Sequence, residues 1–331
     1  MSSDFQAILV SRDENKKQSI TIAEMRDNEL MEGDVLVRVD HTTVNYKDGL
    51  AITGKAPVVR RWPMIPGIDL AGTVISSDSA EWKAGDKIVL NGWGVGEVHY
   101  GAYAGHARLK GEWLIAQPEG LTGHDAMAIG TAGYTAMLCV MALEKQGVTP
   151  ASGPVLVTGA AGGVGTIAIA ILANLGFHVI ASTGRPQEQA FLEGLGAKEI
   201  IDRAELSSPA KPLGKERWAA AIDTVGSHTL ANVLSMTNYG GTVAACGLAQ
   251  GMDLPSSVAP FILRAVALRG VESVYVPRPY RREAWSRLAA DLPMDMLNAL
   301  SATIGFDDLI EAGGQIVEGK VRGRLVVDYK Q

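Results

Sequence analysis

The stretch Val155-Leu-Val-Thr-Gly-Ala-Ala-Gly-Gly-Val-Gly165 determines the fold of this chain. Its first apolar residues predict a buried strand, its glycines a tight turn, and the apolar run that follows Gly165 a helix. Such a turn brings backbone N–H groups and the positive end of a helix dipole against a pyrophosphate. Ala160, Gly162 and Gly165 occupy the positions of a Gly-x-Gly-x-x-Gly dinucleotide motif. The predicted phosphate-binding residues are Ala161, Gly162, Gly163 and Val164; a glycine turn without a ligand is the alternative.

The end of the next predicted strand, His178–Thr183, indicates which dinucleotide binds. NAD enzymes place an acidic residue at this point, where it binds the adenosine ribose. This chain has Ser182-Thr183-Gly184-Arg185 and no acid. Hydroxyl and guanidinium groups can bind a 2′-phosphate through charge-assisted hydrogen bonds, whereas a carboxylate would repel it. We therefore predict NADPH as the cofactor, with Arg203 as a candidate second cation; a solvated surface arginine is the alternative for Arg185 and Arg203.

Strands alternate with helices from about residue 125 onward, which is typical of a doubly wound parallel sheet in an α/β protein. The predicted helices are Ala126–Lys145, Gly165–Leu175 and Gln187–Leu195. The predicted strands are Pro154–Thr158, His178–Thr183, Ala220–Thr224, Thr242–Cys246 and Leu268–Val271. The earlier part of the chain is rich in strands and turns, with strands predicted at Asp34–Asp40, Leu70–Ile75 and Lys87–Leu90. A helix, Tyr280–Leu292, and a strand, Gly323–Asp328, follow. We predict a nucleotide-binding domain of residues 126–275 inserted into a domain of residues 1–125 and 276–331.

Composition excludes several classes of protein. The 331 residues are 47% apolar and 20% charged, with a net charge of −6, so no electrostatic field attracts nucleic acid or an anionic membrane. Cys139 and Cys246 lie in apolar runs and are expected to be small buried hydrophobes, too few for a cysteine zinc site. Val164–Thr183 is apolar enough to imitate a membrane span but is predicted to be a helix, a turn and a strand. We expect a soluble, cytoplasmic protein.

Three segments of this sequence carry a family resemblance. Val44-Asn-Tyr-Lys-Asp-Gly49, Ile65-Pro-Gly-Ile-Asp-Leu-Ala-Gly72 and Gly130-Thr-Ala-Gly-Tyr-Thr135 precede the glycine turn in the order seen in the medium-chain dehydrogenases/reductases. The resemblance implies a Rossmann domain inserted into a GroES-like catalytic domain. Zinc-dependent members carry a Cys in the first segment and Pro-Gly-His-Glu in the second. Asn45 and Ile68-Asp69 stand near or at those positions here, so no metal site is predicted.

Further segments resemble the acrylyl-CoA reductase branch, which is often labelled quinone-oxidoreductase-like. They are Asn91-Gly-Trp-Gly-Val-Gly-Glu-Val-His99, Met64–Asp69, Ala136–Leu143 and Ala220–Gly226. The resemblance implies a homodimer that uses NADPH to reduce an acyl-CoA substrate, acrylyl-CoA, to propanoyl-CoA. It also places residues other than those of the glycine turn along the cofactor. These are Tyr46, Thr131, Leu248, Ile262, Ser273 and Arg324.

The missing zinc agrees with this chemistry. Alcohol oxidation uses a metal to stabilise the alkoxide, whereas an enoyl thioester is already electrophilic at its β-carbon. Hydride addition leaves an enolate that needs hydrogen-bond donors and then a proton. Tyr46 is the candidate catalytic residue, because a phenol is protonated at neutral pH; a tyrosine that only packs under the nicotinamide is the alternative. Its neighbours Asn45, Lys47 and Asp48 stay unranked, and His99 and His106 are expected to be part of loop structure.

Two other functions remain open from the sequence. An NADPH:quinone oxidoreductase would share the fold and the cofactor, and a non-catalytic nucleotide-binding structural protein belongs to another class. Arg60-Arg61 and the Arg278–Arg282 segment could bind CoA phosphates, or they could be solvated charge clusters.

Overall fold

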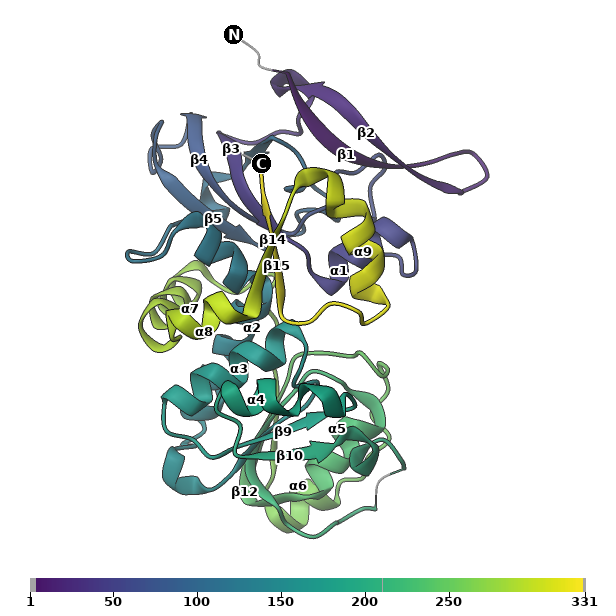
Figure 1. The fold of residues 1–331 in the computed structure, drawn as a ribbon, viewed down its shortest axis with the longest axis vertical. Coiled ribbons are helices and arrows are strands. Elements are labelled where there is room, and N and C mark those ends of the chain that lie inside the picture. The colour runs from purple at the N-terminus through teal and green to yellow at the C-terminus, as the bar shows by residue number, and fades with distance from the viewer. Residues whose placement is uncertain (1–3, 210, 330–331) are drawn as a thin grey trace. The chain divides into compact units, whose positions relative to one another are not determined.

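The structure, a computed structural model, describes residues 4–209 and 211–329 and divides the chain into two compact units (Figure 1). Unit 1 comprises Met1–Thr131, Ser273–Ala289 and Asn298–Gln331, and unit 2 comprises Ala132–Glu272 and Ala290–Leu297. The predicted boundaries follow residues 125 and 275, whereas unit 1 extends to Thr131, the main part of unit 2 ends at Glu272, and unit 2 also includes Ala290–Leu297, which the prediction gave to the other domain. The parts of that prediction that concern residues 1–3, 210 and 330–331 lie outside the described residues.

Unit 2 is built on a six-stranded parallel sheet, and the predicted doubly wound α/β fold is confirmed. The strand order is β10-β9-β8-β11-β12-β13. Apolar side chains of several strands, among them Leu156, Ile180 and Val243, form one buried cluster, which explains the apolar runs in the sequence. The strands are β8 Val155–Val157, β9 Val179–Thr183, β10 Glu199–Asp202, β11 Trp218–Asp223, β12 Thr237–Ala245 and β13 Ala267–Gly270.

The helices of unit 2 follow the strands as a doubly wound sheet requires. They are α3 Gly163–Asn174, α4 Gln189–Gly194, α5 Ser227–Ser235 and α6 Ala259–Arg264. Helix α4 is shorter than predicted, because a 3-10 turn at Pro186–Glu188 precedes it. Cys139 is buried as expected, but the prediction for Cys246 is wrong: it is only partly buried, because it lies just past the end of β12.

Helix α2, Gly123–Lys145, is interrupted at Gly130, which has φ 50 and ψ −162. A Cβ at Gly130 would lie 2.6 Å from the guanidinium of Arg324, so a side chain has no room there. The helix is long and apolar enough to cross a membrane by composition alone, but 89% of its most apolar window is buried inside the protein. It is a core helix, and the chain passes from unit 1 to unit 2 just after Gly130.

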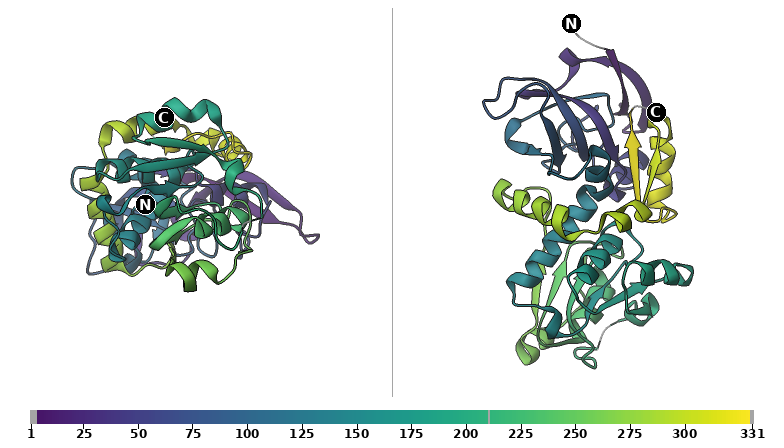
Figure 2. Two further views of the ribbon diagram at one scale, coloured as in Figure 1. Left: turned by 90° about the horizontal axis from the view of Figure 1, so that it is seen from below. Right: turned by 60° about the vertical axis from the view of Figure 1, so that its left-hand side comes forward.

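Unit 1 contains a seven-stranded sheet and a separate two-stranded one. The larger sheet has the order β14-β15-β3-β4-β5-β7, with β6 also paired to β3. Strand β15, near the C-terminus, pairs antiparallel with β3 from the N-terminal part. In Figure 2 the yellow C-terminal strands accordingly lie within the purple and blue N-terminal part of the chain. The strands of the larger sheet are β3 Val35–Thr43, β4 Asp69–Ser77, β5 Lys87–Asn91, β6 His106–Leu109, β7 Ile115–Ala116, β14 Ser301–Ile304 and β15 Arg324–Asp328. The smaller sheet pairs β1 Asp4–Arg12 with β2 Gln18–Arg26.

Two short helices of unit 1 cross at glycines. They are α1, Tyr46–Thr53, and α9, Leu309–Val317. A Cβ at Gly49 would lie 2.6 Å from the carbonyl oxygen of Gly313, so the backbones approach as closely as they do only without a side chain there. Helix α7, Arg278–Asp291, belongs to unit 1 up to Ala289, whereas the first residues of α8, Met294–Leu300, belong to unit 2.

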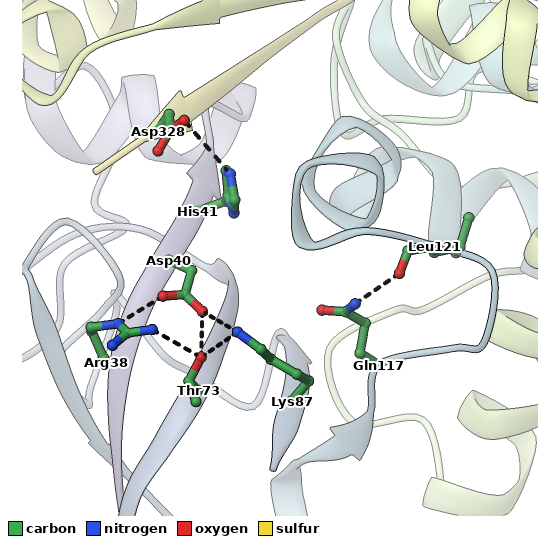
Figure 3. A network of polar contacts seen from close by, with 8 residues as sticks. All are labelled: Arg38, Asp40, His41, Thr73, Lys87, Gln117, Leu121 and Asp328. Atoms are coloured by element: carbon green, nitrogen blue, oxygen red, sulfur yellow. Dashed lines mark hydrogen bonds and ion pairs between the residues drawn. The ribbon is translucent and has the colours of Figure 1, made fainter. Parts of the chain in front are cut away.

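A polar network ties the middle strands of unit 1 together (Figure 3). The carboxylate of Asp40 on β3 accepts hydrogen bonds from Arg38 at 2.8 Å and from Lys87 on β5 at 3.2 Å. It also accepts one from the hydroxyl of Thr73 on β4. Burial alone would raise the pKa of Asp40, but these three hydrogen bonds together lower it. The network helps to fix the register of the strands whose other ends carry Asp69 and Asn91.

Candidate active site

The glycine turn of unit 2 joins β8 to the start of α3 within a few residues. Gly159 has a φ of +59, and a Cβ there would collide with the hydroxyl of Thr224. A Cβ at Gly165 would collide with the carbonyl oxygen of Gly159, so the helix packs against the strand only with glycine at this position. Gly162 is the N-cap of α3, and its side-chain-free backbone leaves the first N–H groups of the helix open. The motif comparison did not identify Gly159, whose positive φ makes the turn possible.

The end of β9 brings the predicted 2′-phosphate residues to this turn. Ser182 and Thr183 are buried at the end of the strand, and one terminal nitrogen of Arg185 lies 3.5 Å from the carbonyl oxygen of Ala161. A Cβ on Gly184 would collide with the guanidinium group of Arg203, so that side chain lies over Gly184. Neither Arg185 nor Arg203 forms an ion pair with a carboxylate within the described chain. Two guanidinium groups are thus available to an anion.

Leu248 and Ile262, which the resemblance placed along the cofactor, are exposed apolar residues of unit 2. Their side chains are exposed to 58% and 72%. Leu248 lies on the loop after β12, beside Gly226 at the start of α5, and Ile262 lies on α6. Ser273 lies in unit 1, where its carbonyl oxygen is 3.4 Å from a terminal nitrogen of Arg281.

Unit 1 contains a buried group of polar residues that we name the carboxylate cluster: Asn45, Asp48, Asp69, Thr131 and Arg324. Asn45 caps the N-terminus of α1 and connects the cluster. Its Nδ2 donates to Asp48 at 3.1 Å and to Asp69 at 2.8 Å. Its Oδ1 accepts from Arg324 at 3.3 Å. Asn45, which stood near the expected position of a zinc-binding Cys, therefore binds two carboxylates.

Asp69, at the start of β4, fixes the position of Thr131. Its carboxylate accepts hydrogen bonds from the backbone N–H of Thr131 at 2.7 Å and from the Thr131 hydroxyl. The Nδ2 of Asn91, at the end of β5, also donates to it at 2.8 Å. Thr131, a predicted cofactor-binding residue, is therefore held by both its backbone and its side chain.

Arg324 supplies the positive charge of the cluster. Its side chain is buried, and it donates to the carbonyl oxygen of Ala128 at 2.9 Å and to the hydroxyl of Thr43 at 2.8 Å. Burial lowers the pKa of Arg324, and the charges of Asp69 and Asp48 act in the opposite direction. All these side-chain contacts lie inside unit 1. We therefore propose that Arg324 positions Asn45 and stabilises the carboxylates.

Asp48 is a weaker acid than an ordinary carboxyl group. It accepts from the backbone N–H of Asn45 at 2.9 Å and of Ile68 at 3.0 Å. Burial, together with the charge of Asp69, raises its pKa to about 7. The cluster therefore exchanges a proton near neutral pH, at the first turn of α1.

Tyr46 begins α1 directly after the capping residue Asn45. Its side chain is 48% exposed, and within the described chain its hydroxyl has no hydrogen-bond partner. The capping interactions of Asn45 and Asp48 fix the first turn of α1, and so they fix the direction in which the Tyr46 ring extends. Lys47 instead pairs with Glu97, at 2.8 Å.

The two histidines have structural partners. Nε2 of His99 lies 2.7 Å from the carbonyl oxygen of Arg108, and burial is the main cause that lowers its pKa. Nδ1 of His106 lies 2.7 Å from the carboxylate of Asp27. His106 lies in strand β6 rather than in a loop, so that part of the expectation is wrong.

The residues of unit 1 do not fit a catalytic zinc. Asn45 is committed to the two carboxylates, and Ile68 has no donor atom. No group of three His, Cys, Asp or Glu side chains that could hold a metal occurs in residues 4–209 and 211–329. We derive no step through a metal.

Two family descriptions match this chain. Residues 31–149 match "Alcohol dehydrogenase GroES-like domain", and residues 163–290 match "Zinc-binding dehydrogenase". Together with the parallel sheet and the glycine turn, they define a medium-chain dehydrogenase/reductase.

Full-length relatives narrow this class. Acrylyl-CoA reductase AcuI of Ruegeria pomeroyi is 50% identical over 98% of this chain and 99% of that protein. The yhdH oxidoreductase of Salmonella enterica, solved in complex with NADP, is 49% identical, with a TM-score of 0.95 over 98% of this chain and 99% of that one. Putative quinone oxidoreductase YhfP of Bacillus subtilis is 39% identical over 99% of both. The chain belongs to the acrylyl-CoA reductase branch of the medium-chain dehydrogenases/reductases.

Proposed function

We propose that this protein reduces the Cα=Cβ bond of acrylyl-CoA to give propanoyl-CoA, with NADPH as the reductant and without zinc. The observation that carries the proposal is the similarity along the whole chain to acrylyl-CoA reductase of Ruegeria pomeroyi. The structure adds a site chemistry that agrees with it: two arginines that have no carboxylate partner among the described residues and suit a 2′-phosphate, and a polar cluster in place of zinc ligands.

The residues of unit 2 would hold the cofactor. The turn Ala161–Val164 offers its backbone N–H groups to the pyrophosphate, and Arg185 and Arg203 bind the 2′-phosphate beside Ser182 and Thr183. When bound, NADPH supplies the hydride that enters the substrate at Cβ. Leu248 and Ile262 offer apolar contacts to the same ligand.

The residues of unit 1 would act on the thioester. Reduction at Cβ places negative charge on the thioester oxygen, and the exposed hydroxyl of Tyr46 can donate to it. Asn45 and Asp48 hold the first turn of α1, so the phenol is oriented before the substrate arrives. The enolate then takes a proton at Cα, with the solvent as the final source. Thr131, held by Asp69, positions the cofactor.

The test is a comparison of substrates with purified enzyme. We expect NADPH oxidation with acrylyl-CoA to exceed that with a simple quinone, and deuterium from C4 of labelled NADPH to appear at Cβ of propanoyl-CoA. Efficient quinone turnover without propanoyl-CoA would instead assign the quinone reductase function, which the name of the Bacillus subtilis relative suggests. Absence of both activities with retained NADPH binding would indicate a structural protein.

We also propose a cytoplasmic homodimer, formed through strand β13. This strand is at the edge of the unit 2 sheet, and an open edge pairs readily with another strand. The segment before it exposes large apolar side chains, which a second copy would cover. They are Met252, Leu254, Val258 and Leu263. Light scattering of the wild type should show a dimer, and Val258→Lys together with Leu263→Asp should give a monomer; a wild-type monomer would contradict the proposal.

A further inference from the structure

We propose that Lys47, Arg60 and Arg61 form a subsite for the phosphate groups of CoA, and that the buried carboxylate of Glu97 holds two of them in place. The subsite depends on the function proposed above and names the part of unit 1 that recognises the nucleotide end of the substrate. CoA carries a pyrophosphate and a 3′-phosphate, so its recognition calls for several cations that can contact separate phosphate oxygens.

The buried carboxylate of Glu97 pairs with two of the cations and holds them side by side. Its side chain is only 7% exposed, and its two oxygens contact different partners: Oε1 lies 2.8 Å from Nζ of Lys47, and Oε2 lies 2.9 Å from Nη2 of Arg60. The backbone N–H of Arg60 also donates to the carbonyl oxygen of Glu97, at 2.9 Å. Arg60 is therefore fixed through both its backbone and its side chain, and Lys47 is held beside it. One carboxylate and two cations leave a net positive charge.

The cations keep binding capacity toward solvent. The side chains of Lys47 and Arg60 are 37% and 65% exposed. A guanidinium group has five N–H donors, and within the described chain only one carboxylate oxygen contacts that of Arg60. Arg61 is exposed and has no carboxylate partner among the described residues. Burying the carboxylate of Glu97 costs solvation energy. An arginine that served only solubility would not need a buried carboxylate to hold it in place, so the position of Arg60 matters.

The surroundings of these residues suit the rest of the substrate. Lys47 follows Tyr46, the residue that we place at the reacting thioester. On the other side, Val98 follows Glu97, and both Val98 and Tyr275 approach Gly94: a Cβ there would lie 2.9 Å from a methyl group of Val98 and 3.4 Å from the hydroxyl of Tyr275. Val98 and Tyr275 are 40% and 60% exposed, so they offer apolar surface for the pantetheine arm.

The second basic segment, Arg278–Arg282, is less suited to the same role. Arg278 pairs with Glu81 at 2.6 Å and donates to the carbonyl oxygen of Leu114 at 3.0 Å. Arg281 is buried and donates to backbone carbonyl groups, including that of Asn91 at 3.0 Å. These side chains hold unit 1 together, whereas Arg60 and Arg61 face solvent.

The experiment compares two thioesters in matched variants. S-acryloyl-N-acetylcysteamine contains the reacting group of acrylyl-CoA but no phosphate. For Arg60→Ala and for Arg61→Ala, we expect kcat/KM with acrylyl-CoA to fall about tenfold, since each change removes a charge-assisted hydrogen bond. The value with the short thioester and the KM for NADPH should stay unchanged. Arg26→Ala is the control, because Arg26 is also 65% exposed and pairs with a single carboxylate, that of Asp4.

Other outcomes would overturn either the subsite or the proposed function. Equal losses with both thioesters, a raised KM for NADPH alone, or no change in either arginine variant would overturn the subsite. If the wild type fails to reduce acrylyl-CoA, the proposed function fails, and calorimetric titration with CoA alone then judges the subsite: binding that Arg60→Ala weakens supports it, and equal or absent binding refutes it. Glu97→Gln should raise the KM for acrylyl-CoA and leave kcat with the short thioester intact, as expected of a positioning residue.

Discussion

The glycine turn of unit 2 and the carboxylate cluster of unit 1 are built in opposite ways. The turn is made from one continuous stretch, and the phosphate binding that we propose for it depends on backbone N–H groups that glycines at these positions leave accessible. The cluster joins side chains from the start of α1, from β4, from α2 and from β15, which are far apart in the sequence, and Arg324 also binds Thr43 and Ala128 outside the cluster. A site made of backbone depends on local conformation, whereas a site made of buried charges depends on the whole unit.

Among the variants of both sites, Arg324→Met should cause the largest loss of stability, because it removes the positive charge of the carboxylate cluster. The change leaves Asp48 and Asp69 buried without their cation, which costs about 3–5 kcal/mol of unfolding free energy. Denaturant titration measures the loss. Arg217→Met is the control: Arg217 pairs with two exposed glutamates, Glu199 and Glu205, and should contribute no more than about 1 kcal/mol. A loss for Arg324→Met as small as that of the control would show that the cluster does not need its charge.

Tyr46→Phe tests the proposed catalytic residue of unit 1 without changing the buried side chains of the carboxylate cluster. The ring remains and only an exposed hydroxyl is lost, so stability should hold while kcat falls by about 10²-fold. Single-turnover kinetics with acrylyl-CoA measures the change, and the melting temperature serves as the control. An unchanged kcat would restrict Tyr46 to packing or cofactor binding.

Arg185→Ala is the corresponding test of unit 2. Loss of one charge-assisted hydrogen bond should weaken NADPH binding by roughly ten- to a hundredfold and barely affect NADH. Fluorescence titration with both cofactors measures it. Because the turn consists of backbone, the fold should tolerate the change. Equal losses with both cofactors would argue against the 2′-phosphate site.

The pH dependence of stability should reveal Asp48. Its pKa is raised to about 7 in the folded protein, against about 3.9 in an unfolded chain, because burial and Asp69 favour the neutral acid. The folded state therefore holds a proton that the unfolded state releases, and the stability contributed is lost as the pH rises from about 4 through about 7. Unfolding free energies across this range should fall in the wild type relative to Asp48→Asn. Parallel curves would show that Asp48 does not titrate in the folded state.

Chelation should have the smallest effect, namely none. Asn45 and Ile68 provide no zinc site, so activity should survive a strong chelator, and purified protein should contain no stoichiometric zinc. One tightly bound zinc per chain, removed together with activity, would contradict this prediction.

The contrast between a local glycine turn and a cluster of distant side chains also explains which features the sequence could predict. The strand, turn and helix around residue 160 follow from local periodicity, and the sheet of unit 2 was predicted because its apolar runs are buried on both sides. Helices α1 and α9 were not predicted, since they are short and contain glycines. They pack closely where Gly49 faces the carbonyl oxygen of Gly313 and Gly313 faces the side chain of Ile52, a contact between segments far apart in the sequence. The acidity of Asp48 could not be predicted either, because it depends on burial and on Asp69, 21 positions further along the sequence.

The position of β15 has a consequence for biosynthesis. The hydroxyl of Thr43 at the end of β3 donates to the carbonyl oxygen of Leu325, 282 residues later in the chain. At about 5–20 residues per second, a ribosome needs roughly 15–60 s to make that partner strand. During this time unit 2 is synthesised and can fold, while the edge of β3 at His41–Thr43 stays open. A nascent chain can thus form the glycine turn well before it has Arg324, and an unpaired edge of β3 persists during that time.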